Sequence, residues 1–340
     1  MKEIAARIGT SPSTISRALR NDPRISAKMR RRVLREAKKT GYVPDRTISS
    51  TMQRVRSGSS YVEAVIGLWW PGSWTEEELR TRFPSLSGTL DAIRVTAESL
   101  RLACVPRDGL PKDPRAALRI YRNRGARGFI VLPGDPEVYR VPRAFSESIV
   151  VAVGNAPQGR VQSRVTTHFA DAYATIFEQL RKRGYRRPGV VVRHNARSER
   201  LYEPRYLGTY EHYCKRLRYF REVTPLRVGD PAVKGVGREL EDWLESEEPD
   251  AIVTPYASIY HALQGKARWS IPGRLGCVIT GVPPEAPELS GPITDAAAVG
   301  REAVYAMLNR LHNTDAASAP DTRLLIKTTW SEGSTLPARR

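Results

Sequence analysis

The sequence is poor in residues that stabilise folds through covalent bonds or metal ions. It has three cysteines, Cys104, Cys214 and Cys277, with no C-x-x-C pair, so neither a disulfide framework nor a zinc site is indicated. We expect buried thiols and a reducing, cytoplasmic location. No run approaches the roughly 18 apolar residues that a membrane span needs, and the basic N-terminus lacks the apolar core of a signal peptide. We therefore expect no membrane partner.

The patterns of catalytic sites are missing as well. The histidines show no H-E-x-x-H or other metal-ligand spacing, and the glycines form no phosphate-cradling loop. The histidines are His168, His194, His212, His261 and His312. The sequence thus predicts a protein that is not an enzyme and that needs neither a cofactor nor a metal ion.

Acidic residues are also scarce, and unevenly so. The chain of 340 residues holds 55 Lys and Arg against 36 Asp and Glu, which gives a formal charge of +19. Residues 1–58 carry 15 basic and 4 acidic residues, so more than half of the excess lies in the first sixth of the chain. Such a local excess predicts an anionic partner and suits neutralisation of a DNA backbone.

A short pair of helices is predicted at the N-terminus. Ser11 is a good helix cap and Pro12 suits the first helical position. Ile15, Ala18 and Leu19 follow the spacing of a buried stripe. A shorter amphipathic helix over residues 2–8 precedes it across a Gly-Thr turn, which is the size that joins a helix-turn-helix pair.

The opposite face of the second helix presents Ser13, Arg17 and Arg20. Arginine can donate two parallel hydrogen bonds to guanine, and serine can reach base edges or phosphates. A solvated helix with ordinary surface charges is the alternative.

Two further segments complete the basic region. Ser26 should cap a third helix that runs to about Thr40, with Met29 and Val33 in its inner stripe. Residues 46–56 then place Ile48 and Met52 on one side of a short basic segment, before a Ser-Gly linker. Apolar side chains of such a segment could be wedged into a minor groove; a plain linker helix packed on the next domain is the alternative.

Residues 1–60 resemble the DNA-binding headpiece of the LacI/GalR (lactose-repressor) family, through SPSTISRALRN, ISAKMRRRVLREAKKTGYVP and the hinge segment. The resemblance implies that Ser11 and Thr14 hold phosphates and that Pro12, Ser13 and Arg17 face bases. The family's leucine wedge is replaced by Thr51, with Met52 beside it as our first choice of wedge. Met1 falls at the position where the family usually has the cap of the first helix, so a native start upstream of Met1 stays an open alternative. The expected DNA-binding set is Ser11, Pro12, Ser13, Thr14, Ser16, Arg17, Arg20, Asn21, Arg46, Ile48, Thr51 and Met52.

From residue 62 onward, short apolar runs alternate with amphipathic stretches, which predicts parallel sheets covered by helices. This half resembles the periplasmic-binding-protein-like core of the same family, through THFADAYATIFEQLRKRGYRRPGVVV, IPGRLGCVITG and LLIKTTWSEGSTL. The expected fold is an all-α headpiece (1–45), a hinge and linker (46–60) and a two-lobed α/β domain (61–340) for effector binding and dimerisation. We expect an N-lobe of about 61–155 plus 282–313 and a C-lobe of about 156–281 plus 314–340.

Ligands of such sheets bind at the carboxyl ends of the strands. Arg205 occupies the family's ligand-gripping position, where its guanidinium could hold two hydroxyls or a carboxylate; an interlobe salt bridge is the alternative. Tryptophans after the first strand could stack on a sugar or belong to the core. The expected ligand set is Trp70, Trp74, Asn155, His194, Arg205, Tyr256 and Val282.

Two departures from the family concern polar contacts to the ligand. The usual Asn-Asp pair reads Tyr256-Ala257, and the usual Phe-Asp-Asp reads Val282-Pro283-Pro284. Either the effector differs from an ordinary sugar or the cleft no longer binds one. We expect a transcriptional regulator, most simply a repressor, that binds a palindromic double-stranded DNA operator as a homodimer under allosteric control by a sugar or related small molecule. The alternative is a constitutive or architectural DNA-binding protein whose large domain only dimerises.

Overall fold

The computed structural model divides the chain into two compact units, Met1–Tyr61 and Val62–Arg340, which we describe separately. The residues that it describes are 7–11, 14–15, 18, 25–39, 63–72, 74–134, 139–193, 203–229, 236–264, 266–283, 285–312 and 320–339. Among these residues, none of the helices combines the length and the apolar character that a bilayer crossing requires.

In the first unit, described side chains from three segments form a small apolar cluster. Helix α3 spans Ala27–Lys39, and the Oγ atom of Ser26 accepts a hydrogen bond from the amide of Met29 at 3.3 Å, as expected of a cap. The buried members of the cluster are Ile8, Ile15, Ala18 and Val33, with Ile25 and Met29 packed against them. The predicted inner stripes are therefore confirmed at these positions.

The second unit begins with a six-stranded parallel sheet in the order β13-β7-β5-β3-β1-β2. Three of its strands, β1, β3 and β5, are apolar runs that are buried on both faces, as expected for a parallel sheet. The strands are β1 (Ala64–Trp69), β2 (Leu102–Val105), β3 (Ala126–Val131), β5 (Ile149–Val153), β7 (Ser163–Thr167) and β13 (Thr322–Ile326).

Helices cover both faces of this sheet. On one face, Ile66 and Leu68 pack with α6 (Ser87–Ser99) and α13 (Ala296–His312). On the other face, Trp69 and Phe129 pack with α7 (Pro114–Asn123). The short helix α5 (Glu76–Arg82) precedes α6 and carries a complete capping box at Thr75. Successive side chains of β1 thus point to opposite faces of the sheet and belong to two separate apolar cores.

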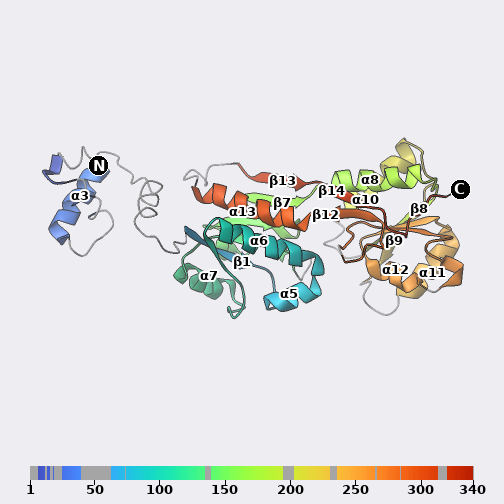
Figure 1. Ribbon diagram of the computed structural model, residues 1–340, viewed down its shortest axis with the longest axis horizontal. Helices are drawn as coiled ribbons and strands as arrows, with labels where there is room; N and C mark the ends of the chain where they lie inside the picture. The colour runs from blue at the N-terminus through green and yellow to red at the C-terminus, as the bar shows by residue number, and fades with distance from the viewer. Residues whose placement is uncertain are drawn as a thin grey trace. The chain divides into compact units, whose positions relative to one another are not determined.

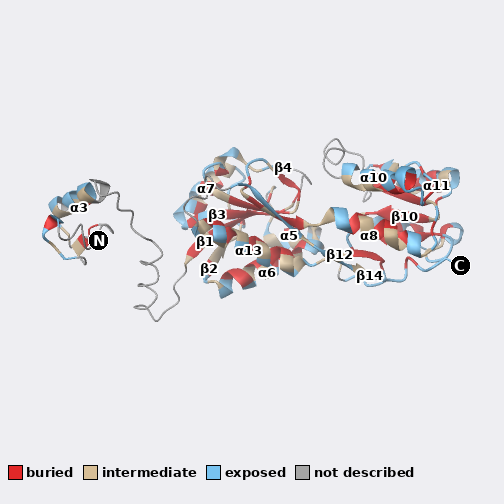
Figure 2. Cartoon of the chain, turned by 90° about the horizontal axis from the view of Figure 1, so that it is seen from above, coloured by how far each residue is buried: buried red, intermediate tan, exposed pale blue. Residues whose placement is uncertain are grey.

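A second parallel sheet has the order β11-β10-β8-β9, with helices on both faces (Figure 1). Figure 2 shows its buried strands between partly exposed helices. Its strands are β8 (Pro188–Arg193), β9 (Leu226–Val228), β10 (Ala251–Thr254) and β11 (Gly276–Ile279). Its helices are α8 (Phe169–Lys182), α10 (Glu203–Glu211), α11 (Val236–Glu247) and α12 (Ala257–Leu263).

The chain crosses between the two sheets three times, after β7, after β12 (Gly291–Thr294) and between β13 and β14 (Thr328–Ser331). Strands β12 and β14 pair antiparallel. A small parallel pair, β4 (Tyr139–Arg140) and β6 (Pro157–Gln158), lies beside the first sheet.

The sheet topology corrects the expected lobe boundaries. Strands β7 and β13, which we had placed in the C-lobe (156–281 plus 314–340), pair in register and belong to the first sheet. The first lobe therefore extends to about residue 167 and includes 295–326. The error has a physical cause: SRVTT and TRLLI are short, partly polar segments that do not stand out as apolar runs.

Candidate functional site

Two of the expected DNA-binding residues lie within the described part of the first unit. The Oγ atom of Ser11 accepts a hydrogen bond from the amide of Thr14 at 3.2 Å, and the two hydroxyl oxygens are 2.9 Å apart. Ser11 therefore caps the helix, as predicted, and its exposed hydroxyl stands where a helix N-terminus attracts anions. The other expected residues lie outside the described residues: Pro12, Ser13, Ser16, Arg17, Arg20, Asn21, Arg46, Ile48, Thr51 and Met52.

Helix α3 adds positive charge to the same unit. Lys28, Arg31, Arg32 and Arg35 are exposed along the helix. The buried face of the helix holds Val33. This distribution gives the unit an apolar inside and a cationic outside, as phosphate neutralisation requires.

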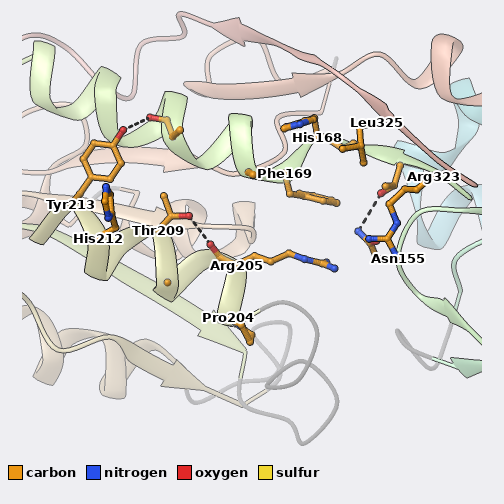
Figure 3. Close-up of a pocket in the computed structure, with 15 residues that line it drawn as sticks. Asn155, His168, Phe169, Pro204, Arg205, Thr209, His212, Tyr213, Arg323 and Leu325 are labelled. Atoms are coloured by element: carbon orange, nitrogen blue, oxygen red, sulfur yellow. Dashed lines mark hydrogen bonds between the residues drawn. The ribbon is translucent and has the colours of Figure 1, made fainter. Parts of the chain in front are cut away.

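In the second unit, a cavity of about 680 Å³ lies between the end of β7, β13, α8 and α10. Its size is within the range of small-molecule sites. The lining residues are Asn155, Thr166, Thr167, His168, Phe169, Ala170, Ala174, Pro204, Arg205, Gly208, Thr209, His212, Tyr213, Arg323 and Leu325. Figure 3 shows side chains from both lobes converging on this space.

Arg205 extends from α10 toward Asn155 and Arg323 (Figure 3). Its Nη1 atom is buried and has no hydrogen-bond partner among the described residues. A buried cationic donor without a partner is costly, so such a donor in a native structure calls for an explanation, and a ligand that accepts a hydrogen bond from it would provide one. The predicted arginine thus lies in a cavity with an unused donor.

Polar groups surround that guanidinium. The side-chain amide of Asn155 donates to Thr166 Oγ1 at 3.2 Å, which holds the Asn155 side chain in place. His168 caps α8, because its Nδ1 atom accepts from the amide of Asp171 at 3.1 Å. Hydroxyls and amides at fixed positions are the groups that orient a polyhydroxyl ligand.

A π-helical turn, His212–Arg216, follows α10 directly. It brings both His212 and Tyr213 to the wall of the cavity. The Tyr213 hydroxyl donates to Glu178 Oε1 at 3.2 Å, and burial together with Glu178 raises the pKa of Tyr213 to about 12. Tyr213 is therefore a neutral donor at physiological pH. Single π-helical turns occur preferentially at functional sites, and here the turn lines the cavity.

The cavity lining is cationic. Arg205 and Arg323 supply the positive charge, and none of the described lining residues is a carboxylate. A cavity that binds neutral sugars would pair hydroxyl donors with acidic acceptors, whereas this lining offers an excess of donors. The chemistry therefore favours a ligand with an anionic group.

A second cavity, of about 520 Å³, adjoins the first and shares Asn155, Thr166, Thr167 and Phe169 with it. It lies at the carboxyl ends of β3, β5 and β11 and at the first turn of α6, which has no side-chain cap. Free amide groups at such a turn can donate to ligand oxygens. The two cavities together form a site with one polar, cationic end and one more apolar end.

The structure brings together part of the expected ligand set. Asn155 and Arg205 line the first cavity, and Asn155 and Val282 line the second. His194 lies outside the described residues. Phe169, Arg323 and the threonines of β7 were not in the expected set. They lie on or next to the two strands that the apolar pattern did not reveal.

The aromatic candidates are placed elsewhere. Trp70 is fully buried in the core with α6 and α13, and its indole nitrogen donates to the carbonyl of Trp74 at 2.9 Å. Trp74 packs near Phe83 and lines a separate surface hollow beside α5. Tyr256 is the N-cap residue of α12 and packs on the core of the second sheet. None of the three is among the described residues that line the two cavities.

The described residues contain no group of three or more metal-ligating side chains. The cysteines follow the expectation of buried thiols in two cases: Cys214 and Cys277 are buried, whereas Cys104 is partly accessible. Burial raises the pKa of both Cys104 and Cys214 to about 11.

Two family models match the chain. Residues 1–45 match bacterial regulatory proteins of the lacI family, and residues 177–336 match a periplasmic binding protein-like domain. A curated relative, the HTH-type transcriptional regulator AglR of Rhizobium meliloti (strain 1021), is 39% identical over 71 residues. That stretch spans 21% of this chain and 18% of the relative.

Solved structures share the fold over nearly the whole chain. The transcriptional regulator CelR in complex with cellobiose and the lac repressor dimer bound to operator and the anti-inducer ONPF each give a TM-score of 0.60. They are 17% and 16% identical and cover 98% of both chains. A LacI family regulator from Enterococcus faecium with bound ribose has a TM-score of 0.59 at 12% identity, over 81% of this chain and 100% of that one.

Proposed function

Because the chain belongs to the lacI family of bacterial regulatory proteins, we propose that it represses transcription by binding a near-palindromic operator as a homodimer, under control of a small acidic ligand. The family consists of regulators, and the chain is accordingly not an enzyme, as its sequence indicates. Its described structure supports the proposal with a capped helix in a cationic first unit and a lined cavity in the second.

The first unit is proposed to bind the operator. Arg17 follows the Ser11 cap by six residues in the sequence, and its guanidinium can donate two hydrogen bonds to one guanine. One such unit contacts a half-site, so a twofold pair would place two recognition helices on successive turns of the duplex. Residues 46–56 of the two copies would then occupy the minor groove between the half-sites.

Selection of bound duplexes from a random pool tests this part. We expect an inverted repeat, and we expect Arg17→Ala to lose about 1 to 3 kcal/mol of binding free energy and to relax preference at one base pair. An equal loss on every sequence would mean that Arg17 contacts only phosphate. Met52→Ser should reduce operator bending, and unchanged bending would remove Met52 as the wedge.

The ligand of the second unit is proposed to be a sugar or related metabolite with a carboxylate or phosphate group. The observation that carries this proposal is the unused, buried Nη1 donor of Arg205, within a lining that holds Arg323 and no described carboxylate. A guanidinium binds a carboxylate or a phosphate through two parallel hydrogen bonds. The hydroxyls of the ligand would contact Asn155 and the β7 threonines, and a sugar face would pack on Phe169.

Thermal denaturation of the full chain tests the ligand class. Matched neutral and acidic probes, such as glucose, glucuronate and glucose 6-phosphate, separate the charge of the ligand from its ring. A ligand at 100 times its Kd stabilises the folded state by about 2.7 kcal/mol, a clear rise in Tm. Acidic members of a broad panel should raise Tm and alter operator affinity, whereas neutral members should not.

Arg205→Met should abolish that rise in Tm, while Arg221→Met, an exposed arginine on the same lobe, should retain it. A rise with neutral sugars alone would refute the acidic ligand. No rise across the panel, with operator binding intact, would instead favour the constitutive DNA-binding protein whose large domain only dimerises.

A further inference from the structure

The outer face of α7 carries a row of arginines. Ala117, Leu118 and Tyr121 face the core. The exposed Arg115, Arg119 and Arg122 follow at intervals of four and three residues, so they share the opposite side of the helix. The helix itself contains no acidic residue; the only carboxylate at its start is that of Asp113, whose side chain accepts the amide of Ala116 as a cap.

A second group of arginines adjoins this row. Arg115, Arg119 and Arg122 line a surface hollow with Ala144, and Arg140, Arg143 and Arg160 line the next hollow with Phe145. Arg143, Ala144 and Phe145 are consecutive residues of one 3-10 turn, so the two hollows are neighbours. We call this surface the arginine face; it consists of Arg115, Arg119, Arg122, Arg140, Arg143 and Arg160.

The charge of the arginine face is almost uncompensated. Arg122 is 3.9 Å from Glu147, but both side chains are largely exposed and such a pair contributes little. The side chains of the other five arginines have neither an ion pair nor a hydrogen bond to any described residue. Some exposed arginines elsewhere in the same unit are paired, for example Arg181 with Glu178 and Arg268 with Glu245. Five guanidinium groups without a partner among the described residues, and a sixth that is only weakly paired, therefore indicate a polyanionic partner.

The last turn of α7 leads into β3, and Ala126 of β3 pairs with Val65 of β1. Arg122 thus lies toward the end of the sheet at which β1 begins. Val62, through which residues 1–61 are joined to this unit, is two residues before β1. A duplex that the first unit binds is therefore connected, through the chain itself, to this end of the sheet. That connection favours DNA over a polyanion that is not linked to the protein.

We propose that the arginine face binds the phosphate backbone of duplex DNA beside the sequence that the first unit binds. The contact rests on the proposed function for its location and supplies affinity without base specificity. Arginine suits it, because a guanidinium donates two hydrogen bonds to one phosphate. Arg115 and Arg122 are separated by about 10.5 Å along the helix axis, which is close to the rise of about three phosphates on one strand.

The test uses the full chain and three probes: a 40-bp duplex with the selected operator at its centre, a 20-bp duplex limited to that operator, and a 40-bp duplex of unrelated sequence. The variant is Arg119→Gln/Arg143→Gln/Arg160→Gln. The matched control is Arg216→Gln/Arg221→Gln/Arg274→Gln, which removes the same charge from exposed positions on the other lobe. Thermal melting of both variants checks that the fold is retained, since all six positions are exposed.

We expect the wild-type chain to bind the 40-bp operator at least ten-fold more tightly than the 20-bp operator at 100 mM salt. The first variant should lose this advantage, and its slope of log K against log salt should fall by up to about 2.7 for three lost phosphate contacts. The control variant should keep both. Equal weakening by the two variants, or no advantage of the longer duplex in the wild type, would overturn the proposal.

The readouts separate this inference from the function on which it rests. Arg17→Ala probes only the base preference of the first unit. If that preference is absent while the first variant still weakens binding to the unrelated 40-bp duplex, the proposed function fails and the arginine face remains a DNA-binding surface. If preference is normal but the variant binds every duplex like the wild type, the arginine face is refuted alone. Tighter binding of a 40-nucleotide RNA hairpin through the same arginines would also refute it.

Discussion

Replacing Arg310 should destabilise the second unit by an amount that depends on the substitute. Arg310 is 5% exposed on α13, and its guanidinium donates to the carbonyls of Gln162 and Pro320, both at 2.6 Å, and to Ser163 Oγ at 3.0 Å. It thereby attaches α13 to β7 and β13, the two strands that line the first cavity.

The size of the destabilisation depends on the volume and the hydrogen bonds that remain after Arg310 is replaced. Methionine retains most of the buried volume but none of the donors. Gln162 keeps a hydrogen bond from the Thr322 amide, and Ser163 keeps the Thr322 hydroxyl, so few acceptors become unpaired. Each charge-assisted hydrogen bond contributes about 1.5 to 3 kcal/mol, and part of that is offset because burying the charge is costly. We expect Arg310→Met to cost about 2 kcal/mol, and Arg310→Ala about 4 kcal/mol because it adds a cavity.

Urea denaturation followed by circular dichroism measures both values, with a lower midpoint and an unchanged slope. Arg301→Met is the matched control, since Arg301 is exposed on the same helix, and it should change stability by less than about 0.5 kcal/mol. If Arg310→Met were as stable as the wild type, or as unstable as Arg310→Ala, the hydrogen bonds would not make the contribution assigned to them.

Three other outcomes are expected. Gly300→Ala should cost about 1 to 3 kcal/mol, because its Cβ would lie 2.4 Å from a carbonyl oxygen of α6. Gly237→Ala, with open space around it, should be neutral or stabilising in the same urea denaturation. Glu76→Gln should lower stability at pH 7. Burial alone would raise the pKa of Glu76, yet the arginines of α5 and α6 bring it below its usual value, so the destabilisation should shrink as the pH falls below about 4.5 and through that lowered pKa. Burial raises the pKa of all three thiols, so the native chain should react slowly with a disulfide reagent at pH 8, and rapid reaction of Cys104 would contradict this. The free energy of unfolding should also decline above about pH 9, because the thiols of the unfolded chain ionise at a lower pH than those of the native chain.

The elements that the sequence predicted well are those with strong local signals. Ser11 and Ser26 cap their helices because a hydroxyl at that position satisfies a free amide, which needs no tertiary context. The stripe on α3 was visible because burial of one helix face imposes a period on the residues themselves, and the short apolar runs that alternate with amphipathic stretches indicated parallel sheets covered by helices. These features fix the fold class.

The site was predicted less completely, because its residues depend on which strands become neighbours. Arg323 and Thr166 lie on β13 and β7, which are partly polar and therefore resembled loops. Trp70 illustrates the reverse case: it follows an apolar strand, where a ligand contact is plausible, yet its ring completes the core beneath α6. A position at the end of a strand brings a side chain near the site, but the packing between the sheet and its helices decides whether that side chain lies in the cavity or in the core.

The same two strands explain how a ligand could act at a distance. Thr167, at the end of β7, is 3.0 Å from Thr294 of β12 between hydroxyl oxygens, and the amide of His168 donates to the carbonyl of Ile326 at the end of β13 at 2.8 Å. These bonds join the three crossings between the lobes. Thr167 and His168 also line the first cavity. A ligand held there, as we propose, would touch these crossings, so closure of the lobes around it would change the angle between them. Only a ligand whose affinity differs between the two angles could shift the balance.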